Sequence, residues 1–283
     1  MDNIKIIADS TCDLSADLIE KYDIGILPLT ITMGDKSVKD GNGMNQKEIY
    51  EWSNKTGETP KTAAPTIGEA IDVITPYIEA ERDIIFFGIS EIMSTTCNVM
   101  RLAAETLNYK KLVVVNSRNL STGIGLQVIR AAEQVSRGCT VEEILADNRQ
   151  INGKVKASFV VDTLTFLYRG GRCSSVTALI GNSLKLKPEI VVSDAKMQVR
   201  KKYRGNAKSV ILKYAKEREK ELLLANSARV FITHSGCSEK IINKVKEYLE
   251  SLNKFEEILV TQAGGVISSH CGPNTLGVLY ILN

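Results

Sequence analysis

The stretch from Thr261 to Gly277 combines the side chains and the backbone freedom that a small binding site needs. It contains His270, one of only two histidines in the chain, among glycines, serines and threonines, just before an apolar run that closes the sequence. Small residues let a backbone turn tightly and approach a small molecule closely. We interpret the stretch as a glycine-rich loop that binds an anionic or polar head group through His270. The alternative is a structural loop with an ordinary histidine.

Three further segments are rich in hydroxyl side chains: Lys61–Thr66, Ile89–Thr96 and Asn116–Ser121. The first precedes a predicted helix, and the other two follow predicted strands. In a doubly wound sheet such loops converge on one edge, where ligands bind. Hydroxyl groups and the N–H groups at helix starts can hold an anion without a positive charge, and a carboxylate or a phosphate would fit equally well. The alternative is that each segment only caps a helix.

Other catalytic signatures are missing from the sequence. There is no G-x-S-x-G elbow and no G-x-x-x-x-G-K-[ST] phosphate loop. The Gly-Ile-Gly at 123–125 is followed by Val128, where a dinucleotide fingerprint needs its third glycine. We interpret Asp9 and Asp13 as helix caps in preference to a catalytic carboxylate pair, and His234 as a structural histidine whose ring nitrogens are satisfied.

The cysteines are scattered, and no two of them form a C-x-x-C pair. This spacing argues against a zinc site and against a disulfide framework. Cys271 adjoins His270, but neighbours in sequence need not be in contact. We therefore expect no metal and no cofactor. The cysteines stand at positions 12, 97, 139, 173, 237 and 271.

The first half of the chain alternates between short apolar runs and amphipathic segments. The runs are rich in β-branched residues, which predicts buried parallel strands at Ile4–Ala8, Ile24–Met33, Ile84–Ile89 and Leu112–Val115. Apolar residues at three- and four-residue spacing predict helices at about 15–22, 45–56, 66–80, 97–107 and 121–136. The predicted N-caps are Ser15, Asn45, Thr66 and Ser121.

The second half has a different pattern, with a hairpin and long helices. We predict helices at about 206–224 and 238–252 and strands at Lys156–Asp162, Pro188–Ser193, Met197–Tyr203, Arg229–Thr233, Glu257–Gln262 and Gly277–Leu282. The boundary lies near Asn152–Lys154, so the expected domains are residues 1–153 and 154–283. The predicted fold class is α/β, with an N-terminal doubly wound, mostly parallel sheet and a C-terminal α+β domain with a mixed or antiparallel sheet.

Charge is distributed unevenly between the halves. Residues 1–150 contain 15 Lys and Arg against 22 Asp and Glu, a net charge of −7, and the remainder carries 21 against 11, a net charge of +10. The basic segments 168–172, 184–188 and 200–205 predict a positive face that docks an acidic partner. Nucleic acid is disfavoured, because few aromatic residues lie between the basic ones. An accident of solvated surfaces is the alternative.

The sequence also carries predictions about location. No apolar run approaches the roughly 18 residues of a membrane span. The N-terminus enters a strand at once, which leaves no room for a signal peptide. We expect a protein of the bacterial cytoplasm that has no membrane span and contacts a membrane only transiently.

Several short motifs, taken in order, resemble the DegV family of fatty-acid-binding proteins over nearly the whole chain. Each motif is weak alone, but their order and spacing agree. They are Asp9–Ser15, Thr62–Thr66, Ser90–Thr96, Ser117–Gly123, Leu167–Arg172, Leu186–Pro188, Lys202–Arg204 and His270–Pro273. The resemblance implies a two-domain α/β protein that buries a long-chain fatty acid, and thus a carrier and not an enzyme. By motif position, Thr62, Ser94 and His270 would hold the carboxylate.

The resemblance also implies supporting residues and a partner. Thr95, Thr96 and Gly272 would support the loops that hold the carboxylate. Some family members are the acyl-binding subunit of a fatty acid kinase and present the carboxylate to an ATP-binding subunit that makes acyl phosphate. Arg172 and Arg204 match two arginines implicated in meeting that subunit, so we expect them on a docking face outside the ligand pocket. The alternative function is an enzyme that acts on a small carboxylated or phosphorylated metabolite at the same loops.

The serine loop departs from the family pattern. The family's usual Ser-Ser-Gly-Leu-Ser-Gly-Thr reads Ser90-Glu-Ile-Met-Ser-Thr-Thr96 here, which lacks both glycines and adds Glu91. We predict an altered backbone near Ser94, and repulsion of a carboxylate if Glu91 faces the head group. The family's Gly-Pro-Gly-Thr has Asn274 in third place, a mild change because Asn tolerates left-handed backbone.

Burial of the acyl tail should dominate the affinity. Each methylene removed from water contributes about 0.8 kcal/mol, so a chain of about 16 carbons offers on the order of 10 kcal/mol before ordering costs. A surface groove would forfeit much of this free energy, so we predict a closed tunnel. The buried carboxylate then needs charged or hydrogen-bonded partners. We expect His270 to serve as an imidazolium together with two hydroxyl groups.

Overall fold

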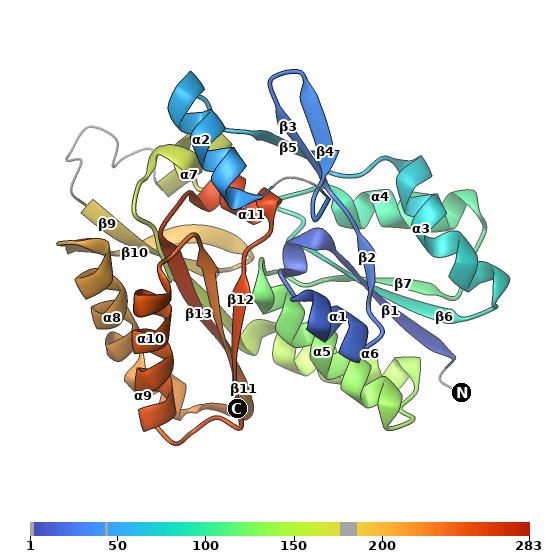
Figure 1. Ribbon diagram of the computed structural model, residues 1–283. Helices are drawn as coiled ribbons and strands as arrows, with labels where there is room; N and C mark the ends of the chain where they lie inside the picture. The colour runs from blue at the N-terminus through green and yellow to red at the C-terminus, as the bar shows by residue number, and fades with distance from the viewer. Residues whose placement is uncertain (1–2, 43–44, 176–185) are drawn as a thin grey trace.

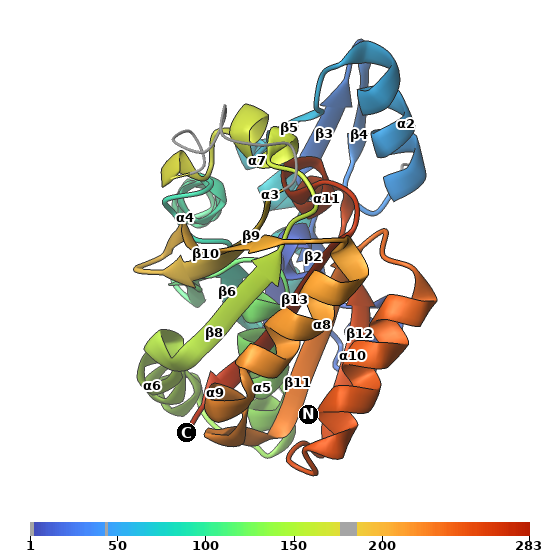
Figure 2. The ribbon, with the colours of Figure 1, turned by 90° about the vertical axis from the view of Figure 1, so that its left-hand side faces the viewer.

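The computed structural model describes residues 3–42, 45–175 and 186–283. These residues form three β-sheets and the helices that cover them (Figures 1 and 2). The helices are α1 (Ala16–Lys21), α2 (Gln46–Thr56), α3 (Ile67–Glu79), α4 (Thr96–Thr106), α5 (Thr122–Ser136), α6 (Val141–Ile151), α7 (Thr165–Gly170), α8 (Ala207–Glu217), α9 (Glu219–Leu223), α10 (Glu239–Ser251) and α11 (Gly265–Cys271). The predicted α/β fold class is confirmed.

Sheet A confirms the doubly wound arrangement of the first half. Its strands are β1 (Ile4–Asp9), β2 (Gly25–Leu27), β6 (Asp83–Gly88) and β7 (Leu112–Asn116), all parallel, in the order β2-β1-β6-β7. A parallel sheet needs cover on both faces. Helices α3 and α4 pack on one face, and α1 and α5 pack on the other. The expected loops 89–96 and 116–121 therefore lie at the carboxyl ends of β6 and β7, whereas the segment 61–66 does not follow a strand of this sheet.

Sheet C is the mixed sheet predicted for the second half. Its strands are β8 (Val155–Val160), β9 (Leu186–Ser193), β10 (Lys196–Arg204), β11 (Ala225–Ser235), β12 (Glu257–Gln262) and β13 (Thr275–Leu282), in the order β10-β9-β8-β13-β11-β12. The predicted β9–β10 hairpin turns at Asp194 and Ala195, whose φ angles are 51° and 63°. Two successive positive φ angles are the pattern of a two-residue hairpin turn.

Sheet B was not predicted, and it corrects the apolar run Ile24–Met33. That run divides at Pro28 into β2, in sheet A, and β3 (Thr30–Met33), which pairs antiparallel with β4 (Lys36–Lys39) and β5 (Lys61–Ala63). Proline has no N–H for a strand ladder, so the chain leaves one sheet there and enters another. Sheet B and α2 lie over α11 in the upper part of Figure 1, and β5, which contains Thr62, contacts α11.

Sheets A and C share one hydrophobic cluster. Helix α5 lies between sheets A and C, and a single hydrophobic cluster contains Phe87 from β6, Ile129 from α5 and Leu279 from β13. Helices α8 and α10 cover the outer face of sheet C. The predicted boundary at residue 153 stays a prediction: the strands of sheets A and C separate there, but their cores join.

Two local predictions are wrong. The helix expected at 206–224 divides at Arg218 into α8 and α9, and the buried guanidinium of this residue pairs with Glu189 and Glu221. Ser121 does not cap α5: its φ angle is 53°, and its hydroxyl donates to Asp13. The caps predicted at residues 15, 45 and 66 are confirmed.

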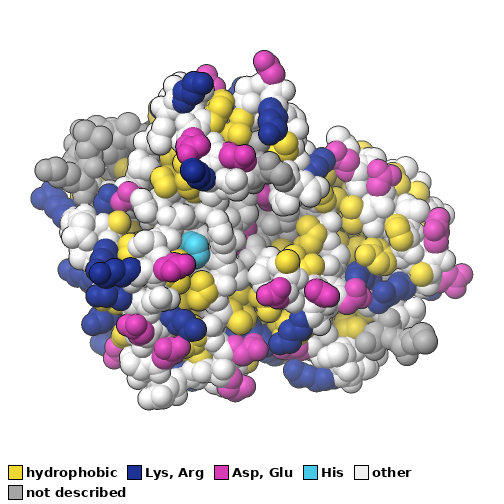
Figure 3. Space-filling model, in the orientation of Figure 1, with side chains coloured by type: hydrophobic (Ala, Val, Ile, Leu, Met, Phe, Trp, Pro, Cys, Tyr) yellow, Lys and Arg dark blue, Asp and Glu magenta, His cyan; other side chains and the backbone are white. Residues whose placement is uncertain are grey.

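The positive face predicted for the second half is partly neutralised. Lys and Arg side chains gather at the left of Figure 3, on the side of α8 and the β9–β10 hairpin. Of the predicted basic residues, Lys187 pairs with Asp162, Arg200 with Glu189, and Lys201 with Glu217. Residues 184 and 185 of the predicted segment lie outside the described residues. None of the helices in the described ranges has the length and apolar character that a bilayer crossing requires.

Candidate functional site

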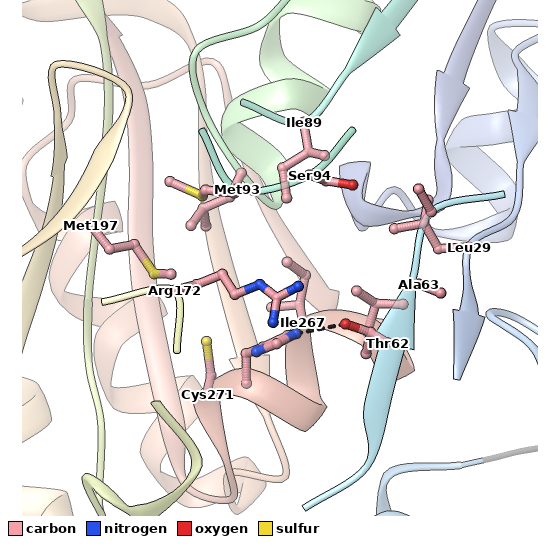
Figure 4. A pocket seen from close by; sticks show the side chains of 14 residues that line it. Leu29, Thr62, Ala63, Ile89, Met93, Ser94, Arg172, Met197, Ile267 and Cys271 are labelled. Atoms are coloured by element: carbon pink, nitrogen blue, oxygen red, sulfur yellow. Dashed lines mark hydrogen bonds between the residues drawn. The ribbon is translucent and has the colours of Figure 1, made fainter. Parts of the chain in front are cut away.

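Four polar side chains from distant segments line one cavity of about 50 Å³. Thr62 comes from β5, Ser94 from the turn before α4, Arg172 from the segment after α7, and His270 from the last turn of α11. In Figure 4, Thr62, Ser94 and Arg172 point into the same space. The rest of the lining is apolar: Leu29, Ala63, Ala64, Ile89, Met93, Leu120, Met197, Val266, Ile267 and Cys271. The structure thus brings Thr62, Ser94 and His270 together, and the Arg172 guanidinium lies beside them.

His270 belongs to a helix and not to the glycine-rich loop that we predicted. Residues Gly265–Cys271 form α11. Its first N–H groups are held by acidic residues from the first half: Gly264 N donates to Asp13 at 2.8 Å, and Gly265 N donates to Asp40 at 2.7 Å. These acceptors satisfy donors that a helix start leaves free, which allows a short helix with a glycine at its N-terminus to form.

The His270 ring is held on two sides. Its Nε2 lies 2.8 Å from Thr62 Oγ1, a hydrogen bond between α11 and β5. On the other side, a Cβ placed on Gly170 would lie 2.3 Å from His270 Nδ1. Only glycine permits so close an approach of the α7 backbone to the imidazole. The surface that the α7 backbone approaches at Gly170 is therefore the His270 ring itself.

The imidazole is neutral at neutral pH, so the expected imidazolium is wrong for the site as it stands. Burial, with a smaller contribution from the positive charge of Arg172, lowers the pKa of His270 from 6.5 to about 4. A buried cation beside another cation is unfavourable, and the ring responds by losing its proton. The positive charge of the site therefore resides on the Arg172 guanidinium.

Arg172 lines the cavity, which corrects its expected place on a docking face outside the pocket. Its Nη1 donates to the Gly170 carbonyl oxygen at 2.8 Å, which bends the side chain back over the end of α7. The residue as a whole is still exposed, so it borders both the cavity and the surface. Arg204 lies at the end of β10, is exposed, and does not line this cavity.

The serine loop folds without its missing glycines. Ser90 O accepts bonds from Met93 N at 2.8 Å and Ser94 N at 3.1 Å, which makes a helical turn, and no residue from 90 to 96 has a positive φ angle. Ser94 Oγ lies 2.8 Å from the hydroxyl of the buried Thr96, while Thr95 is exposed at the helix start. The altered backbone that we predicted near Ser94 therefore contains no residue in the left-handed conformation.

Glu91 faces away from the cavity. Its carboxylate accepts a bond from Arg101 Nη2 at 2.5 Å and does not line the site. The predicted repulsion of a carboxylate therefore does not arise. The other substitution is mild as predicted, because Asn274 adopts a φ angle of 54°. Gly272, at φ 75°, packs against Phe166 and ends α11.

A second cavity of about 20 Å³ adjoins the first. Leu120, Ile267 and Cys271 line both cavities, and they form the wall between them. The second cavity continues past Phe159 and Leu279, on strands β8 and β13 of sheet C. This second cavity could not be predicted from the sequence, because its lining residues come from five separate segments and have no periodicity in common.

The residues that we set aside have structural places. Asp9 caps the 3-10 turn Ser10–Cys12 and accepts from Ile89 N at 2.8 Å, and Asp13 accepts from Gly264. His234 differs from its prediction in one respect: Nδ1 is buried without a hydrogen-bond partner. In the part of the chain that the structure describes, no group of three His, Cys, Asp or Glu side chains is placed to hold a metal ion.

The lowered pKa of His270 has a consequence for stability. In the unfolded chain His270 binds a proton as the pH falls through 6.5, whereas in the folded protein its imidazole stays neutral until about pH 4. The free energy of unfolding that this difference contributes is therefore present above pH 6.5 and is lost as the pH falls to 4. We expect the free energy of unfolding of wild type to fall by about 2 kcal/mol more than that of His270→Gln across this window. Urea unfolding at both pH values measures the difference. Other groups titrate in both proteins and cancel, so equal losses would contradict the assignment.

Comparisons with known proteins agree with this geometry. A family model described as an uncharacterised protein of the DegV family matches residues 3–283. A DegV domain-containing protein of Clostridium perfringens is 33% identical over 281 residues and covers 99% of each chain. A DegV family protein from Thermus thermophilus, described for fatty acid binding, has a TM-score of 0.91 at 28% identity over 99% of both chains. DegV of Bacillus subtilis, a fatty acid binding protein, has a TM-score of 0.83 at 26% identity over 99% of both chains. This chain therefore belongs to the DegV family.

Proposed function

We propose that this protein binds a long-chain fatty acid, with the carboxylate between Arg172, Thr62, Ser94 and His270. The observation that carries the proposal is a cavity lined by four polar side chains, one of them a cation, and otherwise by apolar ones. A fatty acid has the same division between a charged head and an apolar tail. The fatty acid binding described for the proteins from Thermus thermophilus and Bacillus subtilis supports the assignment.

The head group is matched by one charge and several hydrogen-bond donors. A guanidinium bonds to a carboxylate with charge-assisted bonds that are roughly twice as strong as neutral ones. Thr62 and Ser94 can each donate a hydroxyl hydrogen to the carboxylate. His270, held by Thr62, adds a ring nitrogen at the same place. A carboxylate beside the imidazole also raises the histidine pKa, so binding favours uptake of a proton.

The tail is proposed to run from the first cavity into the second. Their volumes of about 50 and 20 Å³ are far below the roughly 300 Å³ at which ligand pockets begin, so the lining must move when the tail enters. Met93 and Met197 line the first cavity, and unbranched thioether side chains repack easily. We predicted a closed tunnel, and we now propose that the lining side chains move apart to form it when the fatty acid binds.

The lining favours this carrier over an enzyme of small metabolites. Among the described residues that line the first cavity, none is Asp, Glu or Lys. Burial raises the pKa of the Cys271 thiol, which leaves it protonated and a poor nucleophile. Within the described ranges, His270 bonds to Thr62 and to no carboxylate of the kind that orients a catalytic base. The residues can hold a carboxylate, and they lack the groups that would transform it.

We further propose that the bound carboxylate is presented to an ATP-binding kinase subunit. Arg172 borders the surface, and Tyr168 in α7 and Ile92 in the turn before α4 are 49% and 57% exposed. Such exposed apolar side chains beside a polar site suit a protein contact. Arg204, on the β9–β10 hairpin, is proposed to extend this docking face. We place the carrier in the bacterial cytoplasm, in transient contact with the membrane that supplies its ligand.

Ligand identification tests the binding proposal. We expect denaturing extraction of the purified protein, followed by mass spectrometry, to release a long-chain fatty acid in stoichiometric amount. His270→Ala should weaken the binding of a defined fatty acid by about 1.5–3 kcal/mol and leave the circular dichroism spectrum unchanged. Recovery of a small polar metabolite in place of a fatty acid would overturn the proposal. Unchanged affinity in the variant would remove His270 from the site.

A further inference from the structure

Strand β7 leaves one edge of sheet A open. Among the described residues it pairs with β6 alone and ends the sheet. Its sequence is Leu-Val-Val-Val-Asn, and all five residues are partly exposed. Natural proteins usually protect such an edge with charges, a proline or a bulge, because an open apolar strand pairs readily with another strand. Residues Leu112–Asn116 include no charge and no proline.

The free backbone groups of β7 can be assigned. Ile84 N donates to Lys111 O at 2.8 Å, and Ser117 N donates to Gly88 O at 3.1 Å. Every second residue of a parallel strand bonds to the same neighbour. Residues 111, 113, 115 and 117 therefore bond to β6, and Leu112, Val114 and Asn116 direct their N–H and C=O groups outward. Asn152 Nδ2 bonds to Asn116 O at 3.2 Å, which leaves a second lone pair on that oxygen.

These outward groups are symmetric about Val114. In an antiparallel ladder, two hydrogen-bonded residues exchange both of their N–H···O bonds. A second β7 strand that runs antiparallel can pair Val114 with its own copy and Leu112 with Asn116 of that copy. All three outward residues then bond, and the arrangement has a two-fold axis at Val114. The strand is therefore complementary to itself in one register.

The surfaces beside β7 also suit a second copy. Grooves of about 540 and 380 Å³ flank the edge, one on each face of sheet A. Each contains both signs of charge: Glu142 and Lys111 in one, and Glu105 and Arg101 in the other. A strongly acidic or basic partner would meet like charges in both grooves. A second copy of sheet A with its helices carries the same mixture of positive and negative charges in both grooves, as a two-fold interface requires.

We propose that two copies of this chain associate through β7 and join their four-stranded sheets A into one continuous sheet. The pairing is antiparallel and centred on Val114. It lies on the side of β6 away from β1, and it uses no residue that lines the fatty-acid cavity. The dimer therefore stands independently of the proposed ligand.

Charge placed on the axis tests this register. Since Val114 faces its own copy, Val114→Lys and Val114→Glu each bring like charges together, which opposes pairing. We expect the wild-type protein to dimerise with rising concentration in analytical ultracentrifugation, and each variant to raise the dimer dissociation constant by about tenfold or more. An equimolar mixture of the two variants should regain the dimer, because lysine then faces glutamate.

Matched controls separate the interface from general damage. Val260 is a partly exposed valine on β12, an edge strand of sheet C, so Val260→Lys should dimerise as wild type does. Thermal melting of every variant checks the fold. A wild-type protein that stays monomeric up to about 1 mM would overturn the proposal. The proposal would also be overturned if Val114→Lys and Val114→Glu dimerised as well as wild type. It would likewise be overturned if the equimolar mixture of these two variants dimerised no better than either variant alone.

Discussion

Replacing Arg172 with glutamate is expected to lower the affinity for a long-chain fatty acid by about a thousandfold. Arg172 is the charged group among the described residues of the cavity, and burial keeps His270 neutral beside it. The substitution removes a charge-assisted pair with the carboxylate and places a second carboxylate in the same space. Removing one partner of such a pair costs about 2–5 kcal/mol, and the new repulsion adds to this cost.

Arg204→Glu is the matched control for that change. It makes the same charge reversal on an exposed residue outside the cavity, so fatty-acid affinity should stay within about twofold of wild type. Titration calorimetry with one fatty acid measures both variants, and melting curves check that both are folded. If the two variants bind equally well, Arg172 takes no part in holding the head group.

The two variants also separate binding from presentation. In the proposed kinase complex, Arg204→Glu should slow acyl-phosphate formation while the acid stays bound, because its charge meets only the partner. Arg172→Glu should lose both steps together. Our sequence prediction placed the two arginines in one role, but Arg172 lines the cavity and Arg204 does not.

Most elements were predictable, because local periodicity and turn chemistry decide them. The parallel strands of sheet A are short β-branched runs, and the β9–β10 hairpin is centred on a polar turn. These signals lie within a few residues of one another. The motif resemblance then brought Thr62, Ser94 and His270 together, although 208 residues separate Thr62 from its hydrogen-bond partner His270. Periodicity alone could not have paired them.

The misjudged parts depend on contacts between distant segments. Helix α11 has glycine at its start and small polar residues within it, which locally favour a loop. It forms because Asp13 and Asp40 accept its first N–H groups, and neither acceptor is visible near Gly265 in the sequence. Arg172 was misplaced for a similar reason: the close approach of Gly170 to His270 turns the end of α7 inward. Both errors concern tertiary contacts that override local preference.

The passage between the two cavities should set how much of the acyl chain is buried. Cys271 lines both cavities and has a small side chain, so Cys271→Phe should close the passage beside the head group. In wild type, each added methylene contributes about 0.8 kcal/mol, or roughly a fourfold gain in affinity. In the variant we expect this gain to stop once the chain reaches the phenyl ring. Hexadecanoate should then lose about a thousandfold in affinity, equivalent to about five methylenes left outside.

A series from hexanoate to hexadecanoate, measured by calorimetry, gives the slope of affinity against chain length. Cys237→Phe is the control, because Cys237 is also a buried cysteine but lines neither cavity. Overpacking of a core costs about 1–3 kcal/mol of stability in either variant, so both should melt earlier. Only Cys271→Phe should flatten the slope, since it alone blocks the route. A parallel fall for all chain lengths in Cys271→Phe would mean that the tail does not pass between Leu120, Ile267 and Cys271.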